Sequence, residues 1–183
     1  MPVGGANVSI SGAVVTINPT ANLDSSEAYY VQIAATAFDD ASGNSYAGIN
    51  DTTSLSFTAA DTVGPTMVIT STTSGVSSGA ATNDSTINLT FTANEAATGF
   101  VVGDITVTGG SLSSFATVSS TVYTATFTPS GAGAKTIDVA ANKFTDAAGN
   151  NNSAATQFTW NYDNVAPTMA ITSTTSGVSS GST

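Results

Sequence analysis

The side chains of this chain that could bind an ion or take part in a reaction are mainly acidic. It carries twelve Asp and Glu residues against two Lys, with no Arg, His or Cys, and its net charge is −10. No imidazole base, thiol nucleophile or guanidinium clamp is available, so acid–base chemistry would depend on carboxylates, tyrosines or the two lysines. A glycosidase-type carboxylate pair is the one catalytic arrangement left open, but the acids fall in predicted turns and junctions. We therefore expect that the protein is not an enzyme.

Carboxylate and amide oxygens are instead suited to a hard cation. Ca²⁺ takes about six to eight oxygen ligands, although Asp also stabilises turns without any ion. The candidate metal ligands are Asp61, Glu95, Asp104, Asp146 and Asn150. A secondary set, expected to be incomplete, comprises Asp40, Asn44 and Asp163.

A repeat with an offset of 102 residues organises the chain. Residues 65–79 (PTMVITSTTSGVSSG) return at 167–181 with a single change, Val68 to Ala170. Two shorter motifs recur in the same order: FDDASGN at 38–44 as FTDAAGN at 144–150, and DTVGP at 61–65 as DNVAP at 163–167. Because one immunoglobulin-like β-sandwich needs about 100 residues, this period indicates tandem sandwich domains.

The polarity pattern predicts an all-β fold. Apolar residues alternate with Thr and Ser, and Gly, Asn and Pro interrupt the runs at short intervals. The expected strands are 67–71, 86–92, 104–108, 112–118, 122–128, 136–141 and 156–162, with 14–18, 29–35 and 54–58 in the leading part. The expected core residues are Ile87, Leu89, Phe91, Ile105, Val107, Tyr123, Ala125, Phe127, Ile137, Val139, Phe158, Trp160 and Tyr162.

These landmarks predict three parts of unequal completeness. Residues 1–61 are expected to be the C-terminal part of one Ig-like domain, 62–163 a complete domain, and 164–183 a linker with the first strand of a following repeat. Nothing in the first dozen residues matches the first two strands, so we expect exposed apolar surface or an unpaired edge in the first part. No signal peptide and no membrane-inserting segment is expected in this piece.

Sandwich topology gives a reason for the acidic residues to meet. The loops after the second and sixth strands lie at the end of the sandwich where the first strand begins. The linker supplies Asp61, the first of these loops Glu95, the start of the third strand Asp104, and the last loop Asp146 with Asn150. A divalent cation there would neutralise mutually repelling carboxylates. The sequence Asp-Ala-Ala-Gly-Asn also suits a β-turn without an ion, so both interpretations stay open.

Several motifs resemble the bacterial Ig-like repeats of giant secreted surface adhesins. They are FTANEAATGF at 91–100, GDITV at 103–107, FTDAAGN at 144–150 and Asp163-x-Val-x-Pro167. The leading piece is similar to a related repeat type of the same kind of protein. The resemblance implies export to the cell surface or beyond, a spacer role, adjacent repeats as partners, and Ca²⁺ at domain junctions.

Our leading hypothesis is a non-catalytic spacer module stiffened by Ca²⁺. One alternative is a strand-exchanging filament or surface-layer subunit, in which the first domain accepts a strand from a neighbouring chain. Another is a carbohydrate- or ice-binding module that uses exposed threonine hydroxyls. Nucleic acid is excluded as a partner, because the net charge of −10 repels a phosphate backbone.

Overall fold

The structure, a computed structural model, describes residues 7–178. The chain divides after Gly64 into two compact units. Across the described residues the regular structure is β, apart from a short 3-10 turn at Val102–Asp104. No helix in this part of the chain is long and apolar enough to cross a membrane.

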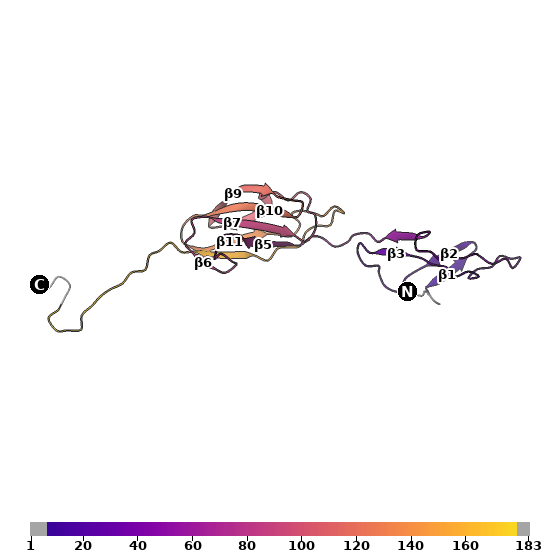
Figure 1. The fold of residues 1–183 in the computed structure, drawn as a ribbon, viewed down its shortest axis with the longest axis horizontal. Helices are drawn as coiled ribbons and strands as arrows, with labels where there is room; N and C mark the ends of the chain where they lie inside the picture. The colour runs from indigo at the N-terminus through magenta and orange to yellow at the C-terminus, as the bar shows by residue number, and fades with distance from the viewer. Residues whose placement is uncertain (1–6, 179–183) are drawn as a thin grey trace. The chain divides into compact units, whose positions relative to one another are not determined.

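The second unit is a sandwich of two four-stranded sheets (Figure 1). One sheet has the order β5 (Met67–Ser71), β7 (Ile87–Ala93), β10 (Val122–Pro129) and β9 (Gly110–Thr117). The other has the order β6 (Ala81–Thr82), β12 (Phe158–Tyr162), β11 (Gly133–Val139) and β8 (Ile105–Thr108). All neighbouring strands are antiparallel except β6 and β12. The predicted all-β sandwich is confirmed.

The core of this sandwich follows the predicted alternation. Eleven of the thirteen expected core residues are buried, and Val107 and Tyr162 pack partly buried against them. Phe127 and Trp160 come from different sheets and meet edge to face, with ring centroids 6.2 Å apart. Their alternate strand positions point into the same layer because successive side chains leave a strand on opposite faces.

Two features of the second unit differ from the prediction. The predicted strands leave residues 72–85 without regular structure, but this segment buries Val76 and forms the short edge strand β6 beside β12. The Gly79 N–H donates a hydrogen bond to the backbone carbonyl of Thr159 at 2.7 Å. β11 also begins earlier than expected and places Lys135 in the core face. The formation of β6 and the early start of β11 both depend on pairing with β12. The polarity pattern of the two segments themselves does not indicate this pairing.

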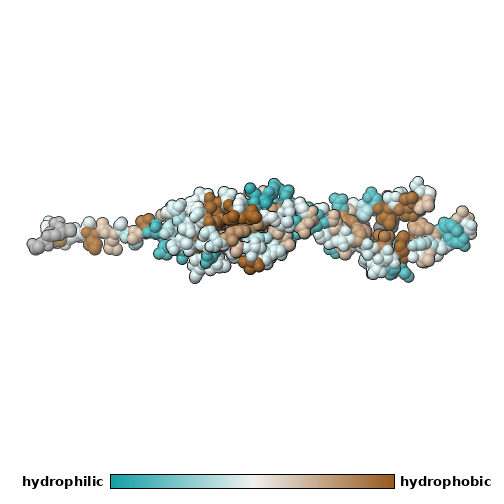
Figure 2. All heavy atoms as spheres, turned by 90° about the horizontal axis from the view of Figure 1, so that it is seen from above, coloured by the Kyte–Doolittle hydropathy of each residue, from teal (hydrophilic) through white to brown (hydrophobic). Residues whose placement is uncertain are grey.

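The first unit is less complete. Its strands are β1 (Val8–Ser11), β2 (Val14–Ile17), β3 (Ala28–Tyr30) and β4 (Ser56–Thr58), and they form two separate antiparallel pairs, β1 with β2 and β3 with β4. The sequence predicts no counterpart of the first two sandwich strands in the first dozen residues. The strand β1 lies in this stretch, and it pairs with β2. The expected strand over 29–35 is limited to β3 and a bridge between Ile33 and Ile49. Figure 2 shows apolar side chains on the surface of this unit. Ile10 is one exposed apolar residue, at 62%.

Candidate metal site

The loop between β11 and β12 fixes the carboxylate of Asp146. The backbone N–H of Asn150 donates to Asp146 Oδ1 at 2.8 Å, and its side-chain Nδ2 donates to Oδ2, also at 2.8 Å. Gly149 has φ of +91°, a left-handed conformation that glycine adopts without strain from a Cβ. The Asp146 side chain is buried, so its direction is set by the fold.

These contacts also determine the charge of Asp146. Burial raises the pKa of its carboxyl group, but hydrogen bonds from the Asn150 side chain and from the backbones of Asn150, Gly149 and Ala148 lower it by more in total. The net pKa lies below the ordinary value of 3.8. Asp146 is therefore an anion at neutral pH.

Asp61 lies in the segment that leads into β5, where its carboxylate closes a local turn. Its Oδ1 accepts hydrogen bonds from the Val63 N–H at 3.1 Å and from Ser25 Oγ at 2.9 Å. The same Ser25 hydroxyl accepts the Thr62 N–H at 2.9 Å. The side chain is half-buried, and this part of the linker is held by three polar contacts.

Glu95 lies two residues beyond the end of β7 and is also half-buried. The preceding Asn94 accepts the Thr66 N–H at 2.6 Å, which ties the end of β7 to the start of β5. Asn94 Nδ2 donates to Glu95 Oε1 at 3.4 Å. The register of β5 and β7 therefore sets the position of the Glu95 side chain.

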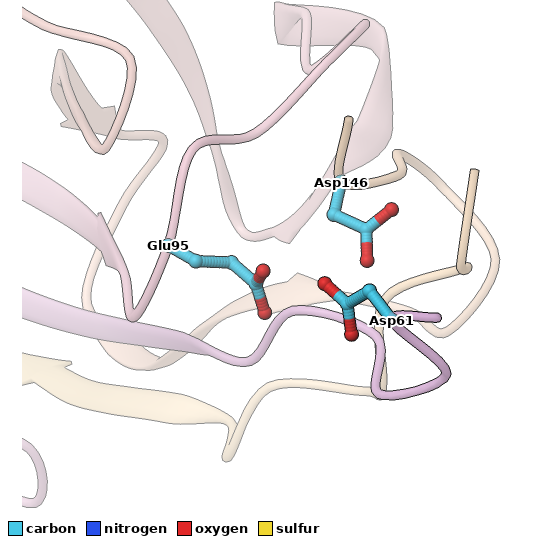
Figure 3. A group of neighbouring side chains, drawn as sticks. All are labelled: Asp61, Glu95 and Asp146. Atoms are coloured by element: carbon cyan, nitrogen blue, oxygen red, sulfur yellow. The ribbon is translucent and has the colours of Figure 1, made fainter. Parts of the chain in front are cut away.

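Asp61, Glu95 and Asp146 converge, and one carboxylate oxygen from each lies within 4.8 Å of the other two (Figure 3). Ca²⁺–oxygen distances of about 2.3–2.6 Å place two ligand oxygens up to about 5 Å apart across one ion. The three carboxylates thus suit a hard divalent cation in chemistry and in spacing. Carbonyl oxygens and water would complete such a ligand set.

Asp104 and Asn150 are the two remaining predicted ligands. Asp104 is not a member of the group of three; its Oδ2 accepts the Val101 N–H at 2.9 Å within the 3-10 turn. Asn150 orients Asp146 through its side-chain amide. The structure therefore brings together three of the four predicted carboxylates and gives the amide a supporting role.

The secondary candidates repeat parts of this geometry. Asp40 accepts the Asn44 N–H and Nδ2–H, each at 2.8 Å, as Asp146 does from Asn150. These hydrogen bonds, led by the Asn44 side chain, lower the pKa of Asp40. Asp163 accepts the Val165 N–H at 3.0 Å, as Asp61 does from Val63. Neither Asp40 nor Asp163 belongs to a close acidic group among residues 7–178.

Asn152 is a supporting residue that the sequence analysis missed. Its side chain is 2% exposed, and its Oδ1 accepts the backbone N–H groups of Lys143 and Phe144 at 2.7 and 3.0 Å. Its Nδ2 donates to the carbonyls of Ala140 and Ser153 at 2.9 and 2.7 Å. Asn152 thereby closes the base of the Asp146 loop. It stands in a run of three Asn residues, 150–152, and nothing local distinguishes it.

The orders of the strands in the two sheets define an immunoglobulin-like β-sandwich module. Two family models, each described as a bacterial Ig-like domain, match residues 61–162 and 1–59. The chain belongs to the bacterial Ig-like domain family, as the sequence motifs predicted. No curated protein and no solved structure gave a match to the chain. Asp61, Glu95 and Asp146 all lie within the 61–162 match.

Proposed function

We propose that this chain is a non-catalytic spacer segment of a repetitive bacterial surface adhesin, stiffened by Ca²⁺ at Asp61, Glu95 and Asp146. The observation that carries the proposal is the convergence of these carboxylates within 4.8 Å. Three anions at this spacing repel one another in the absence of a cation. A bound divalent ion removes that repulsion and contributes its own ligand bonds.

The mechanical consequence follows from the place of Asp61 in the chain. Glu95 and Asp146 belong to the sandwich of the second unit, whereas Asp61 lies in the segment that precedes it. An ion shared by all three ties this segment to the sandwich. The number of accessible linker conformations falls, and the array becomes stiffer.

Surface location and a non-catalytic role agree with the family and with the composition. Bacterial Ig-like domains act as structural modules, and two adjacent matches are the arrangement of a tandem array. Neither His nor Cys is present in the sequence. Extended arrays of such modules hold a distal binding domain away from the cell.

Calorimetric titration with Ca²⁺ tests the metal site. We expect one tight site in the 183-residue chain, lost in Asp61→Ala and in Asp146→Ala. Asp138→Asn is the matched control, because Asp138 is an acid bound to Gln157 outside the group of three and Asn keeps its shape. Absence of binding, or equal loss in the control, would overturn the proposal.

A carbohydrate- or ice-binding face is the second candidate function. Thr90 lies opposite Thr70 on one side and Thr124 on the other, which places three threonines in a row across neighbouring strands. Phe158 and Trp160, in contrast, are buried in the core and offer no stacking platform to a sugar. This candidate would be supported if the chain bound a carbohydrate or ice, if the binding survived Asp146→Ala, and if it were lost on replacing Thr70, Thr90 and Thr124 by Lys.

A further inference from the structure

We infer that the pairing of β6 with β12 is a mechanical clamp, which resists a pull applied along the chain through the second unit. A spacer that is held at both ends transmits tension, so the clamp rests on the proposed spacer function, but it does not require Ca²⁺. The two strands run parallel, whereas the other neighbouring strands described in this unit are antiparallel. The direction of these strands decides how a pull acts on them.

A pull along the chain enters the sandwich just before β5 and leaves it just after β12. Figure 1 shows these two points at opposite ends of the sandwich. The incoming chain reaches β6 at the N-terminal end of that strand, and the outgoing chain leaves β12 at its C-terminal end. Because β6 and β12 are parallel, these are opposite ends of the pair. Tension therefore draws the two strands past one another along their axes, in shear.

The contact between the two segments extends beyond the two residues of β6. Four hydrogen bonds join them: from the Gly79 N–H to the Thr159 carbonyl at 2.7 Å, from the Asn161 N–H to the Ala80 carbonyl at 2.9 Å, from the Asp163 N–H to the Thr82 carbonyl at 3.0 Å, and from the Thr159 N–H to Ser78 Oγ at 3.1 Å. Bonds between parallel strands are spaced evenly along the pair and run across it. Sliding the strands loads all four bonds at once, whereas peeling the strands apart from one end would break the bonds one at a time.

Side-chain contacts fix the segment that contains β6 on both sides of these hydrogen bonds. Before β6, Val76 is 6% exposed and belongs to the core cluster. Within β6, Thr82 Oγ1 accepts a hydrogen bond from the buried Trp160 Nε1 at 3.1 Å and donates one to Asp84 Oδ2 at 2.6 Å. A two-residue edge strand would detach easily if backbone bonds alone held it. Here the core and the Trp160 contact hold it in register with β12.

Single-molecule pulling of the 183-residue chain in chelator tests the clamp through the direction of the load. The sequence has no Cys, so introduced cysteines at exposed positions give defined attachment points. Val63→Cys with Val165→Cys loads the second unit along the chain, and Ser85→Cys with Val165→Cys pulls β6 and β12 from the same end. We expect an unfolding force about two- to fourfold higher along the chain, because four bonds then share a load that otherwise falls on one bond at a time.

Ser78→Ala removes the one side-chain acceptor among the four bonds. Under a fixed load along the chain it should raise the unfolding rate about fivefold, as expected for the loss of one hydrogen bond that still holds at the barrier to unfolding. Ser77→Ala is the matched control, because Ser77 is the exposed neighbouring serine, and it should leave the rate unchanged.

Equal unfolding forces in the two pulling directions overturn the inference. So does an unfolding rate of Ser78→Ala that equals the rate of Ser77→Ala. If Ser78→Ala does not fold, the two pulling directions decide, since they leave β6 and β12 unaltered. Both measurements are made without Ca²⁺, so a failure of the clamp is a separate result from a failure of the metal site, which calorimetry tests.

Discussion

Replacing Asn152 by Ala tests whether one buried amide holds the candidate metal loop. The change removes the acceptor for two backbone N–H groups, those of Lys143 and Phe144, and the donor for the carbonyls of Ala140 and Ser153. A buried donor left without a partner costs about 1–3 kcal/mol. Water can enter and satisfy part of what is lost. We therefore expect the free energy of unfolding of the second domain to fall by about 2–4 kcal/mol.

Chemical denaturation followed by tryptophan fluorescence measures this change, because Trp160 is the single Trp and lies in the core of that domain. For a domain of this size, each kcal/mol lowers the melting temperature by about 4–8 °C. Asn151→Ala is the matched control, since its side chain is exposed one residue away, and it should change stability by less than about 0.5 kcal/mol.

The same variant connects the loop to the metal. Asn152→Ala retains all three carboxylates, so a weaker Ca²⁺ affinity in this variant would show that the position of Asp146 matters as well as its charge. If Asn152→Ala and Asn151→Ala have equal stabilities, the assigned hydrogen bonds do not support the loop, and the reasoning fails.

Three further predictions concern the domains, the metal and the core. Residues 62–163 expressed alone should melt cooperatively by circular dichroism and residues 1–61 should not, because the latter lack the strands that close a second sheet; a cooperative melt of 1–61 would refute the boundary. Small-angle scattering should show a narrower range of conformations with Ca²⁺ than with chelator. The melting temperature should also rise, because Ca²⁺ at a hundredfold excess over Kd stabilises the folded state by about 2.7 kcal/mol. Identical scattering profiles with and without Ca²⁺ would contradict the stiffening mechanism. Phe127→Ala should cost about 3–5 kcal/mol in denaturant titrations, since Phe127 is fully buried against Trp160, and a loss below about 1 kcal/mol would contradict that packing.

The sequence by itself determined most of the core of the second domain and each of its strands except β6. Alternation is a local property, because successive side chains of a strand point to opposite faces whatever the partner strand is. Phe91 and Phe127 were therefore predictable as core residues, and both are buried. The repeat likewise determined the period, since it requires only that two stretches of the printed sequence be compared.

Part of the candidate site also followed from the sequence, once the order of the strands was assumed. The ends of antiparallel strands that meet at one edge were enough to bring Asp61, Glu95 and Asp146 together. Asp104 failed the same argument, because its carboxylate turns back to the Val101 N–H. A side chain one residue from a strand end can face either the junction or its own turn, and strand order does not distinguish the two.

Only the tertiary structure decided the features that depend on a distant partner. The strand β6 forms because the edge of β12 accepts it. Lys135 is buried because β11 begins early beside β12. The side chain of Asn152 is buried because it forms hydrogen bonds with four backbone groups. In each case the local sequence pattern is that of an exposed loop. The environment of these residues is set by segments that can lie far away in the sequence, as Asn161 lies 80 residues from Ala81, its partner in the sheet. The backbone groups of those segments need hydrogen-bond partners, and a short stretch of sequence does not show which residues will supply them.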